Sequence, residues 1–477
     1  MTTTWRVEPV QTTPPPPPKA DRRAGMMRAL ALAVAALLTA NGVVVAEQVT
    51  GRDLIGLAFD GFGNVRSAIG RVLEPDPEKN TVAGAVEEQT STTSTTLAPE
   101  TTTTLAAVPV TTPAPTAPPT TRTTTPPTTA AAPAPNPVDQ AIMAASAFVQ
   151  KERGLRFTSP LKVTMLDEGP FRDRLNAVRT APAVERAKRE QPVLRALGVI
   201  APDVDLSAQV KRLLSIGTVS VFYDAKANEL LVRNGPVTPF VRKVIVHELA
   251  RALDDQSFEL DRPALANADD ETGASFNALS EGVAKRIETR YVNSLPEPDR
   301  KSVDAESRRL AAQVPKDLPP YVLVTYGYPY AAGPKLADAL FGAGGAARVN
   351  AAFQAPPSTS EQVLHPERFL AGEGAKPVPA PGTEGAVVRQ GSLGQLTLSL
   401  MLAEVLEPGY AEGAADGWGG DRFVAWQNGA NTCVRLVVDM DNPEENSELG
   451  DALADWALDR PGATVEGTGP FTVTRCG

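Results

Sequence analysis

Residues 238–256 read TPFVRKVIVHELARALDDQ, and this stretch decides the fold of the chain. A threonine followed by a proline is a typical helix start, because the threonine hydroxyl accepts from free backbone N–H groups of the first turn and proline needs no such partner. Thr238 is therefore the expected N-cap of a helix that begins at Pro239.

The segments on either side predict a hairpin and a second helix. Residues 219–234 (VSVFYDAKANELLVRN) are two β-rich runs around an Asp-Ala-Lys-Ala-Asn turn, which is a hairpin signal. Residues 276–295 (FNALSEGVAKRIETRYVNSL) predict the second helix. In a hairpin, helix, loop, helix order, the first helix lies against the sheet and presents one face to a cleft. Further upstream, the pattern predicts helices over 138–153 and 181–197 and a strand over 161–166, so we expect an α+β domain.

His247 and Glu248 begin a HELAR sequence on the first helix. In an HExxH helix the two histidines, one turn apart, grip one zinc ion, and the glutamate polarises the zinc-bound water. Here the second histidine position is Arg251. The motif is therefore incomplete, and His followed by Glu is by itself a weak signal.

Several longer strings occur in order after this helix and carry a resemblance. They are SFELDRP from residue 257, ALSEGVA from 278, PSTSEQVLHPERFL from 357 and GWGGDRFVAW from 417. Together with HELARALDDQ they resemble a bacterial family of exported zinc-metallopeptidase-like proteins with a gluzincin-type (zincin) fold. In that family the first segment reads close to HELTHALDDQHFDLDRP, with histidines at the positions of Arg251 and Ser257 here.

The resemblance implies a set of site residues. His247 corresponds to a metal ligand, Glu248 to the general base, and Glu281 in the second helix to the third, carboxylate ligand. The middle ligand is lost, because Arg251 stands in its place. His365, the only other histidine, aligns with a histidine that the family also has, so it is no obvious substitute.

The charge of Arg251 argues against zinc. A guanidinium about 4 Å from a divalent ion is repelled by roughly 8 kcal/mol at an effective dielectric constant near 20, and arginine cannot deprotonate. We therefore expect Arg251 to replace the cation, lying between Glu248 and Glu281 and near Asp254 or Asp255. This hypothesis implies no bound cofactor and a catalytically degenerate site. The alternative is an active zinc metallopeptidase with an altered ligand set.

Each candidate residue also has a purely structural interpretation. His247 could be a buried helix histidine, and Glu281 could pair with Lys285, one turn further on. His365 precedes a proline and could orient a loop rather than line the cleft. Tyr330, in a tyrosine-rich stretch beside Gly and Pro, could offer a phenol to an oxyanion in the cleft or pack a turn.

Composition limits the functions open to the chain. Its 477 residues carry 46 Lys and Arg against 56 Asp and Glu, a net charge of −10, which disfavours nucleic acid as a partner. With two histidines and two cysteines, a four-ligand Cys/His zinc site is nearly excluded. Many of the 44 prolines fall before residue 138, so the globular domain is expected over residues 138–477.

The N-terminal segments predict an exported domain held by a membrane anchor. Residues 29–46 (ALALAVAALLTANGVVVA) are uncharged and mostly apolar, close to the ~20 residues that span a bilayer as a helix. A basic, proline-rich tail, residues 1–28, precedes them, so the N-terminus is expected inside and the C-terminal bulk outside. The rival interpretation is a cleaved signal peptide, which would make the protein secreted.

Two further segments are expected between this anchor and the domain. Residues 47–86 form a juxtamembrane segment with a short amphipathic stretch. Residues 87–137 are almost entirely Thr, Pro, Ala and Ser, a composition typical of an extended, disordered stalk.

The two cysteines fit export. Cys433 lies in the strand-like run TCVRLVVDM and Cys476 lies in the last run, FTVTRCG. Two lone cysteines in an oxidising compartment are expected to form a disulfide, which would join the last strand to the body of the domain.

Three functions remain from the sequence. The first is a pseudopeptidase that binds a peptide or an envelope protein in its cleft, the second is the active metallopeptidase, and the third is a structural envelope module. An open, partly apolar cleft would favour binding, whereas a cleft filled by side chains would favour the structural module.

Overall fold

A computed structural model describes residues 136–477 of the chain, and this part is an α+β fold with two sheets and many helices. The tail, membrane helix and juxtamembrane segment predicted over residues 1–86, and nearly all of the predicted stalk, lie outside the described residues. Among the residues that are described, no helix combines the length and apolar character needed to cross a membrane. The first described helix, α5 (Pro137–Arg153), is capped by Asn136, whose side chain accepts hydrogen bonds from the N–H groups of Val138 and Asp139.

The first sheet has the strand order β1-β3-β2. Strand β1 (Lys162–Leu166) pairs in parallel with β3 (Glu229–Arg233), and β2 (Val221–Asp224) pairs antiparallel with β3 across a tight turn. The predicted hairpin is thus confirmed. Between β1 and β2 lie α6 (Glu168–Leu175), the π-helix η1 (Asn176–Thr180), α7 (Ala181–Ala196) and α8 (Leu206–Leu214).

Helix α9 (Pro239–Phe258) follows the hairpin and packs against β2, α5 and α11. Its first turn confirms the predicted cap, because the Thr238 hydroxyl accepts a hydrogen bond from the Val241 N–H. Most of its residues from Lys243 to Asp254 are buried, polar ones included. The helix is therefore held on several sides, and its charged residues must find partners within the domain.

Helix α11 (Thr272–Ser294) lies beside α9 and touches α14 (Gly333–Gln354) very closely. A β-carbon on Gly282 would lie 2.2 Å from the backbone of Gly333, so only glycine fits at this crossing. This contact holds α11 against α14 at Gly282, the residue that follows Glu281. Buried apolar residues of α5, β2, β3, α9, α11 and α14 form one continuous core, which we call the helical core.

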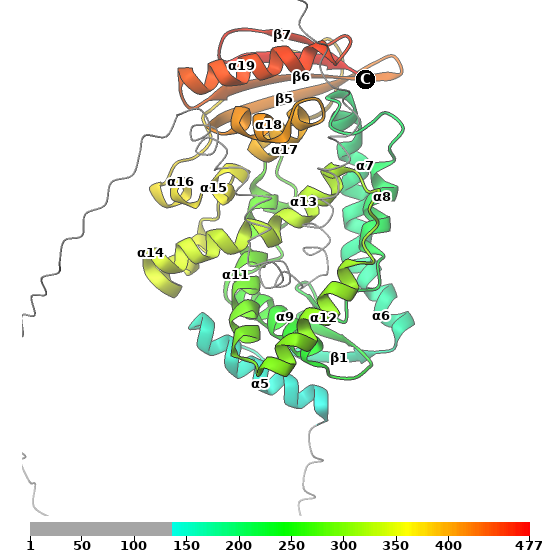
Figure 1. The fold of residues 1–477 in the computed structure, drawn as a ribbon, viewed down its shortest axis with the longest axis vertical. Coiled ribbons are helices and arrows are strands. Elements are labelled where there is room, and N and C mark those ends of the chain that lie inside the picture. Colours follow the sequence, from blue (N-terminus) through cyan, green and yellow to red (C-terminus); the bar gives the residue numbers. More distant parts are fainter. Residues whose placement is uncertain (1–135) are drawn as a thin grey trace, which may run out of the picture. The chain divides into compact units, whose positions relative to one another are not determined.

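The second sheet belongs to the C-terminal part and has the order β4-β5-β6-β8-β7. Figure 1 shows its long strands with α17, α18 and α19 at the orange and red end of the chain. A second core joins this sheet to α7, α8 and α13 (Pro320–Ala331), and we call it the C-terminal core. The sheet is β4 (Val387–Gly391), β5 (Trp418–Asn428), β6 (Asn431–Met440), β7 (Thr464–Glu466) and β8 (Phe471–Cys476); its helices are α17 (Gly394–Ala403), α18 (Pro408–Ala415) and α19 (Pro443–Leu458).

The remaining helices connect these parts. They are α10 (Pro263–Ala266), α12 (Glu297–Ala311), α15 (Ser360–Leu364) and α16 (Pro366–Ala371). Helix α15 contacts both α11 and α17, so it bridges the helical core and the C-terminal sheet.

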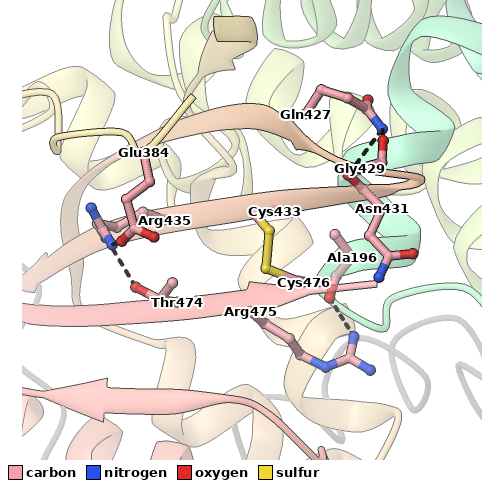
Figure 2. The surroundings of a disulfide bond; sticks show 10 residues. All are labelled: Ala196, Glu384, Gln427, Gly429, Asn431, Cys433, Arg435, Thr474, Arg475 and Cys476. Carbon is pink, nitrogen blue, oxygen red and sulfur yellow. Dashed lines mark hydrogen bonds and ion pairs between the residues drawn. A yellow bond between two sulfur atoms is a disulfide. The ribbon is translucent and has the colours of Figure 1, made fainter. Parts of the chain in front are cut away.

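Cys433 and Cys476 form the expected disulfide between β6 and β8 (Figure 2). The two residues face each other in the strand register, and the Arg475 guanidinium next to Cys476 donates to the Ala196 carbonyl at the end of α7. The last strand is therefore attached covalently to its sheet and by a hydrogen bond to α7.

We expect reduction of this disulfide to destabilise the domain. The bond closes a loop with a sequence separation of 43, for which chain entropy gives about 4 kcal/mol of stabilisation. Denaturant unfolding with and without a reductant measures the difference. The Cys433→Ala/Cys476→Ala variant is the control and should not respond to the reductant; an equal response in both proteins would contradict the prediction.

Candidate functional site

His247 is held between two glutamates of one neighbouring helix. Its Nε2 lies 3.0 Å from Glu281 Oε2 and its Nδ1 lies 3.0 Å from Glu288 Oε2. All three side chains are almost completely buried. Because Glu281 and Glu288 lie two turns apart on α11, they present their carboxylates on the same helix face, one to each nitrogen of the ring.

This geometry requires a charged imidazole. A carboxylate only accepts hydrogen bonds when it is ionised, so both ring nitrogens of His247 must carry a proton. Burial by itself lowers the pKa of His247, but the hydrogen bonds and charges of Glu281 and Glu288 outweigh it and raise the pKa to about 9. At neutral pH His247 is therefore an imidazolium and has no lone pair to offer to a metal.

Glu288 is the centre of a second set of ion pairs, and sequence analysis missed it. Its Oε1 lies 2.6 Å from the Lys285 ammonium and 3.5 Å from the Lys243 ammonium. Burial raises the pKa of Glu288, but the charges of Lys243, Lys285 and His247 lower it to about 2. The only sequence signal was its spacing of seven residues from Glu281, which many surface helices also show.

Arg251 lies against the two carboxylates that the sequence hypothesis assigned to it. Its Nη1 is 3.5 Å from Glu248 Oε2 and its Nε is 3.4 Å from Glu281 Oε1. These distances are long for charge-assisted hydrogen bonds, and the buried Nε makes no hydrogen bond. Burial raises the pKa of Glu281, but the charges of Arg251 and His247 bring it down to about 2. Arg251 thus neutralises Glu281 mainly through its charge.

Glu248 also accepts a hydrogen bond from the backbone of the first sheet. Its Oε2 accepts a hydrogen bond of 3.0 Å from the backbone N–H of Tyr223 on strand β2. The side chain is 9% exposed. The carboxylate that the resemblance assigns to general-base chemistry therefore links α9 to the strand beside it.

Of the two aspartates considered as further partners of Arg251, Asp254 is engaged elsewhere, whereas Asp255 raises the pKa of Arg251 through its charge. Asp254 pairs with Arg153 of α5 at 2.7 Å, and both side chains are buried. Asp255 accepts a 2.6 Å hydrogen bond from the Tyr223 hydroxyl. The alternative pairing of Glu281 with Lys285 is wrong, since Lys285 turns to Glu288 instead.

Of the two possible cleft residues, Tyr330 lies beside His247 and His365 does not. The ring of Tyr330 lies 6.4 Å from that of His247, centroid to centroid, and its segment is part of helix α13 rather than a turn. His365 ends α15, and its Nε2 lies 3.1 Å from Asp416 and from the Gln395 amide. The residues that His365 contacts belong to the α15–α18 region and not to the cluster around His247.

These residues do not fit a zinc site. Zinc in a catalytic site needs three protein ligands and an open position, whereas His247 is doubly protonated and Arg251 stands where the second histidine ligand would be. Within residues 136–477, no three His, Cys, Asp or Glu side chains are grouped so as to hold a metal ion. One feature of a metal site is nevertheless present. A zinc-ligating histidine usually donates its second N–H to a carboxylate, as His247 does to Glu288.

Comparison with known proteins gives one match. Residues 384–475 match a family described as a domain of unknown function (DUF8575). This segment covers the helices of the C-terminal sheet and nearly all of its strands, includes Cys433, and ends one residue before Cys476. No curated protein and no solved structure matches the chain significantly.

We expect NMR to detect a protonated His247 up to about pH 9. The chain has two histidines, so long-range ¹H–¹⁵N spectra of wild type and of His365→Gln assign both rings. The His247 nitrogens should both appear protonated at pH 7 and titrate near 9. An imidazole that is neutral at pH 7 would contradict the arrangement.

The raised pKa of His247 also predicts how its contribution to the free energy of unfolding changes with pH. Because the folded pKa of His247 is raised above its ordinary value near 6.5, its contribution is complete below pH ~6.5 and disappears as the pH rises through about 9. Burial lowers the pKa of Lys243 to about 7, and this acts in the opposite direction above pH 7. Total stability therefore cannot isolate His247, and the ring titration is the measurement to use.

At pH 6, where Lys243 and His247 are both charged, we also expect Glu288→Gln to destabilise the domain by about 3–5 kcal/mol, because two buried ammonium groups and an imidazolium lose their carboxylate. Glu297→Gln is the matched control: Glu297 pairs with Lys301 on the surface of α12, and such pairs contribute at most about 1 kcal/mol. Denaturant unfolding of both variants measures the difference. Equal effects of the two substitutions would contradict the central role of Glu288.

Proposed function

We propose that this chain is a membrane-anchored, extracytoplasmic protein whose domain has a zincin-like metallopeptidase fold, has lost catalysis, and acts by binding or scaffolding. Residues 29–46 would form the anchor. The observation that carries the proposal is the position of Arg251 between Glu248 and Glu281, with His247 held as an imidazolium beside it.

The order of elements around the site supports the fold part of the proposal. The helix with His247 and Glu248 follows an antiparallel hairpin, packs beside it, and faces a second helix that carries Glu281. The carboxylate on the far nitrogen of His247 also supports an origin as a metal ligand, because it keeps the partner that such ligands use.

Loss of catalysis follows from charge and protonation. Metal binding would require His247 to lose a proton although its pKa is raised to about 9. It would also require Arg251 to leave two carboxylates, and a guanidinium stays charged at every relevant pH. The Tyr223 N–H and the Arg251 guanidinium also both lie against Oε2 of Glu248, which lowers the basicity of this carboxylate toward water. Both deprotonating His247 and moving Arg251 away cost free energy. We therefore infer that these side chains keep their positions without a metal.

A second candidate is a structural envelope module in which the former cleft only holds the domain together. Burial favours it: the side chains of His247, Glu248 and Glu281 are less than one tenth exposed. The side chain of Arg251, however, remains 23% exposed, so the site reaches the surface at this residue.

Zinc content tests the proposal. We expect the full chain, dialysed against micromolar zinc and then analysed for metal, to hold none, and Arg251→His to hold about one zinc per chain. The substitution removes the repelling charge and adds an imidazole one helical turn from His247. The Arg251→His/Glu281→Gln variant is the control and should lose the zinc again.

The outcomes separate the alternatives. Stoichiometric zinc in wild type would overturn the proposal and favour the active metallopeptidase with an altered ligand set. Absence of zinc in a folded Arg251→His protein would mean that this cluster does not derive from a zinc site.

A further inference from the structure

A small pocket opens beside the His247 cluster. Helix α8 and the loop after it supply one wall, α13 another, and the π-helix η1 a third. The residues that line it include Arg179, Leu213, Leu214, Ile216, Tyr326 and Tyr330. Tyr330 also contacts the ring of His247, so the pocket and the cluster share a side chain.

Arg179 brings a free cation into this pocket. Its side chain is half-buried, yet within residues 136–477 it has neither a hydrogen bond nor an ion pair. Other partly buried arginines of the domain, such as Arg174 and Arg368, contact two or more carboxylates. Burying part of a guanidinium without an anion costs free energy, so Arg179 is arranged to receive one from outside.

The position of Arg179 is defined by an unusual backbone. It lies in the five-residue π-helix between α6 and α7, and such segments often occur at functional sites. The charge of Arg179 reaches Glu281, Tyr326 and Tyr330, since it opposes the rise that burial causes in the pKa of each group. Arg179 therefore adds to the positive potential that Arg251 provides at Tyr330 and Glu281.

The pocket also has an apolar part. Leu213, Leu214 and Ile216 line it together with the tyrosines, and no carboxylate is among its lining residues. Within the described part of the chain, neither tyrosine hydroxyl makes a hydrogen bond, so both can donate one to a ligand. An anion with a small hydrocarbon group attached would satisfy the guanidinium, the hydroxyls and the leucines together.

We propose that this pocket binds the C-terminal carboxylate of a peptide whose last side chain is aliphatic and no larger than that of leucine, with Arg179 as the carboxylate-binding residue. The carboxylate assignment rests on the pocket, whereas the choice of a peptide rests on the proposed function of the cleft. Two N–H groups of a guanidinium can bind both oxygens of one carboxylate. The leucines then contact the last side chain.

Calorimetric titration of the full wild-type chain tests the carboxylate first. The ligands are N-acetyl-Ala-Leu with a free C-terminus and the same dipeptide as its amide. We expect the free acid to bind and the amide to bind at least tenfold more weakly, because only the acid offers an anion. Equal binding of the two, or binding of neither at millimolar concentration, would overturn the proposal without any variant.

Variants then locate the site. Arg179→Gln should weaken binding of the free acid at least tenfold, Arg179→Lys should retain part of it, and Tyr326→Phe should weaken it less. Arg172→Gln is the control, since Arg172 is an exposed arginine four residues before the start of η1 and pairs with Glu168. Unchanged affinity in a folded Arg179→Gln protein would overturn the assignment to Arg179.

A third ligand, isovalerate, separates the two sources of such a carboxylate. We expect it to bind more weakly than the dipeptide; equal or tighter binding would overturn the peptide assignment and favour a free short-chain acid. The zinc measurement on Arg251→His is independent of these titrations. Failure of the proposed function and failure of this binding site are therefore distinguishable.

Discussion

The domain depends on one buried interaction, the grip of two α11 glutamates on the His247 ring of α9. The two contacts of 3.0 Å join the helix beside the first sheet to the helix beside α14. Three charged groups in a dry interior are costly unless each is paired. Lys285, Lys243 and Arg251 supply the missing charges. The result is a charge network in which removing any member leaves another one unpaired.

This network holds α9 and α11 together through side-chain charges. A proton on His247 and the guanidinium of Arg251 balance the negative charges of Glu281 and Glu288, so the two helices keep their spacing. The close passage of Gly282 and Gly333 fixes α11 independently of any ion. The C-terminal sheet, stabilised by its disulfide, adds a second core against α7, α8 and α13.

Much of the local structure was predictable, and part of the site was too. The Thr238 cap, the hairpin before it and the helix that carries Glu281 follow from turn residues and periodicity, which act between neighbours in sequence. The approach of Arg251 to Glu248 was expected from their spacing on one helix. Glu288, Lys243 and the Tyr223 N–H were not expected, because their roles depend on which helix faces rest against each other.

The sequence by itself determined the helix with His247, Glu248 and Arg251, the α+β character of the domain, and the presence of two cysteines able to pair. Only the tertiary structure decided that His247 is charged, because its protonation depends on carboxylates 34 and 41 residues away. It also decided that Arg179 lines a pocket and has no hydrogen-bond or ion-pair partner among residues 136–477. Charge states and free donors are set by the distances between elements, and these distances follow from packing rather than from local sequence.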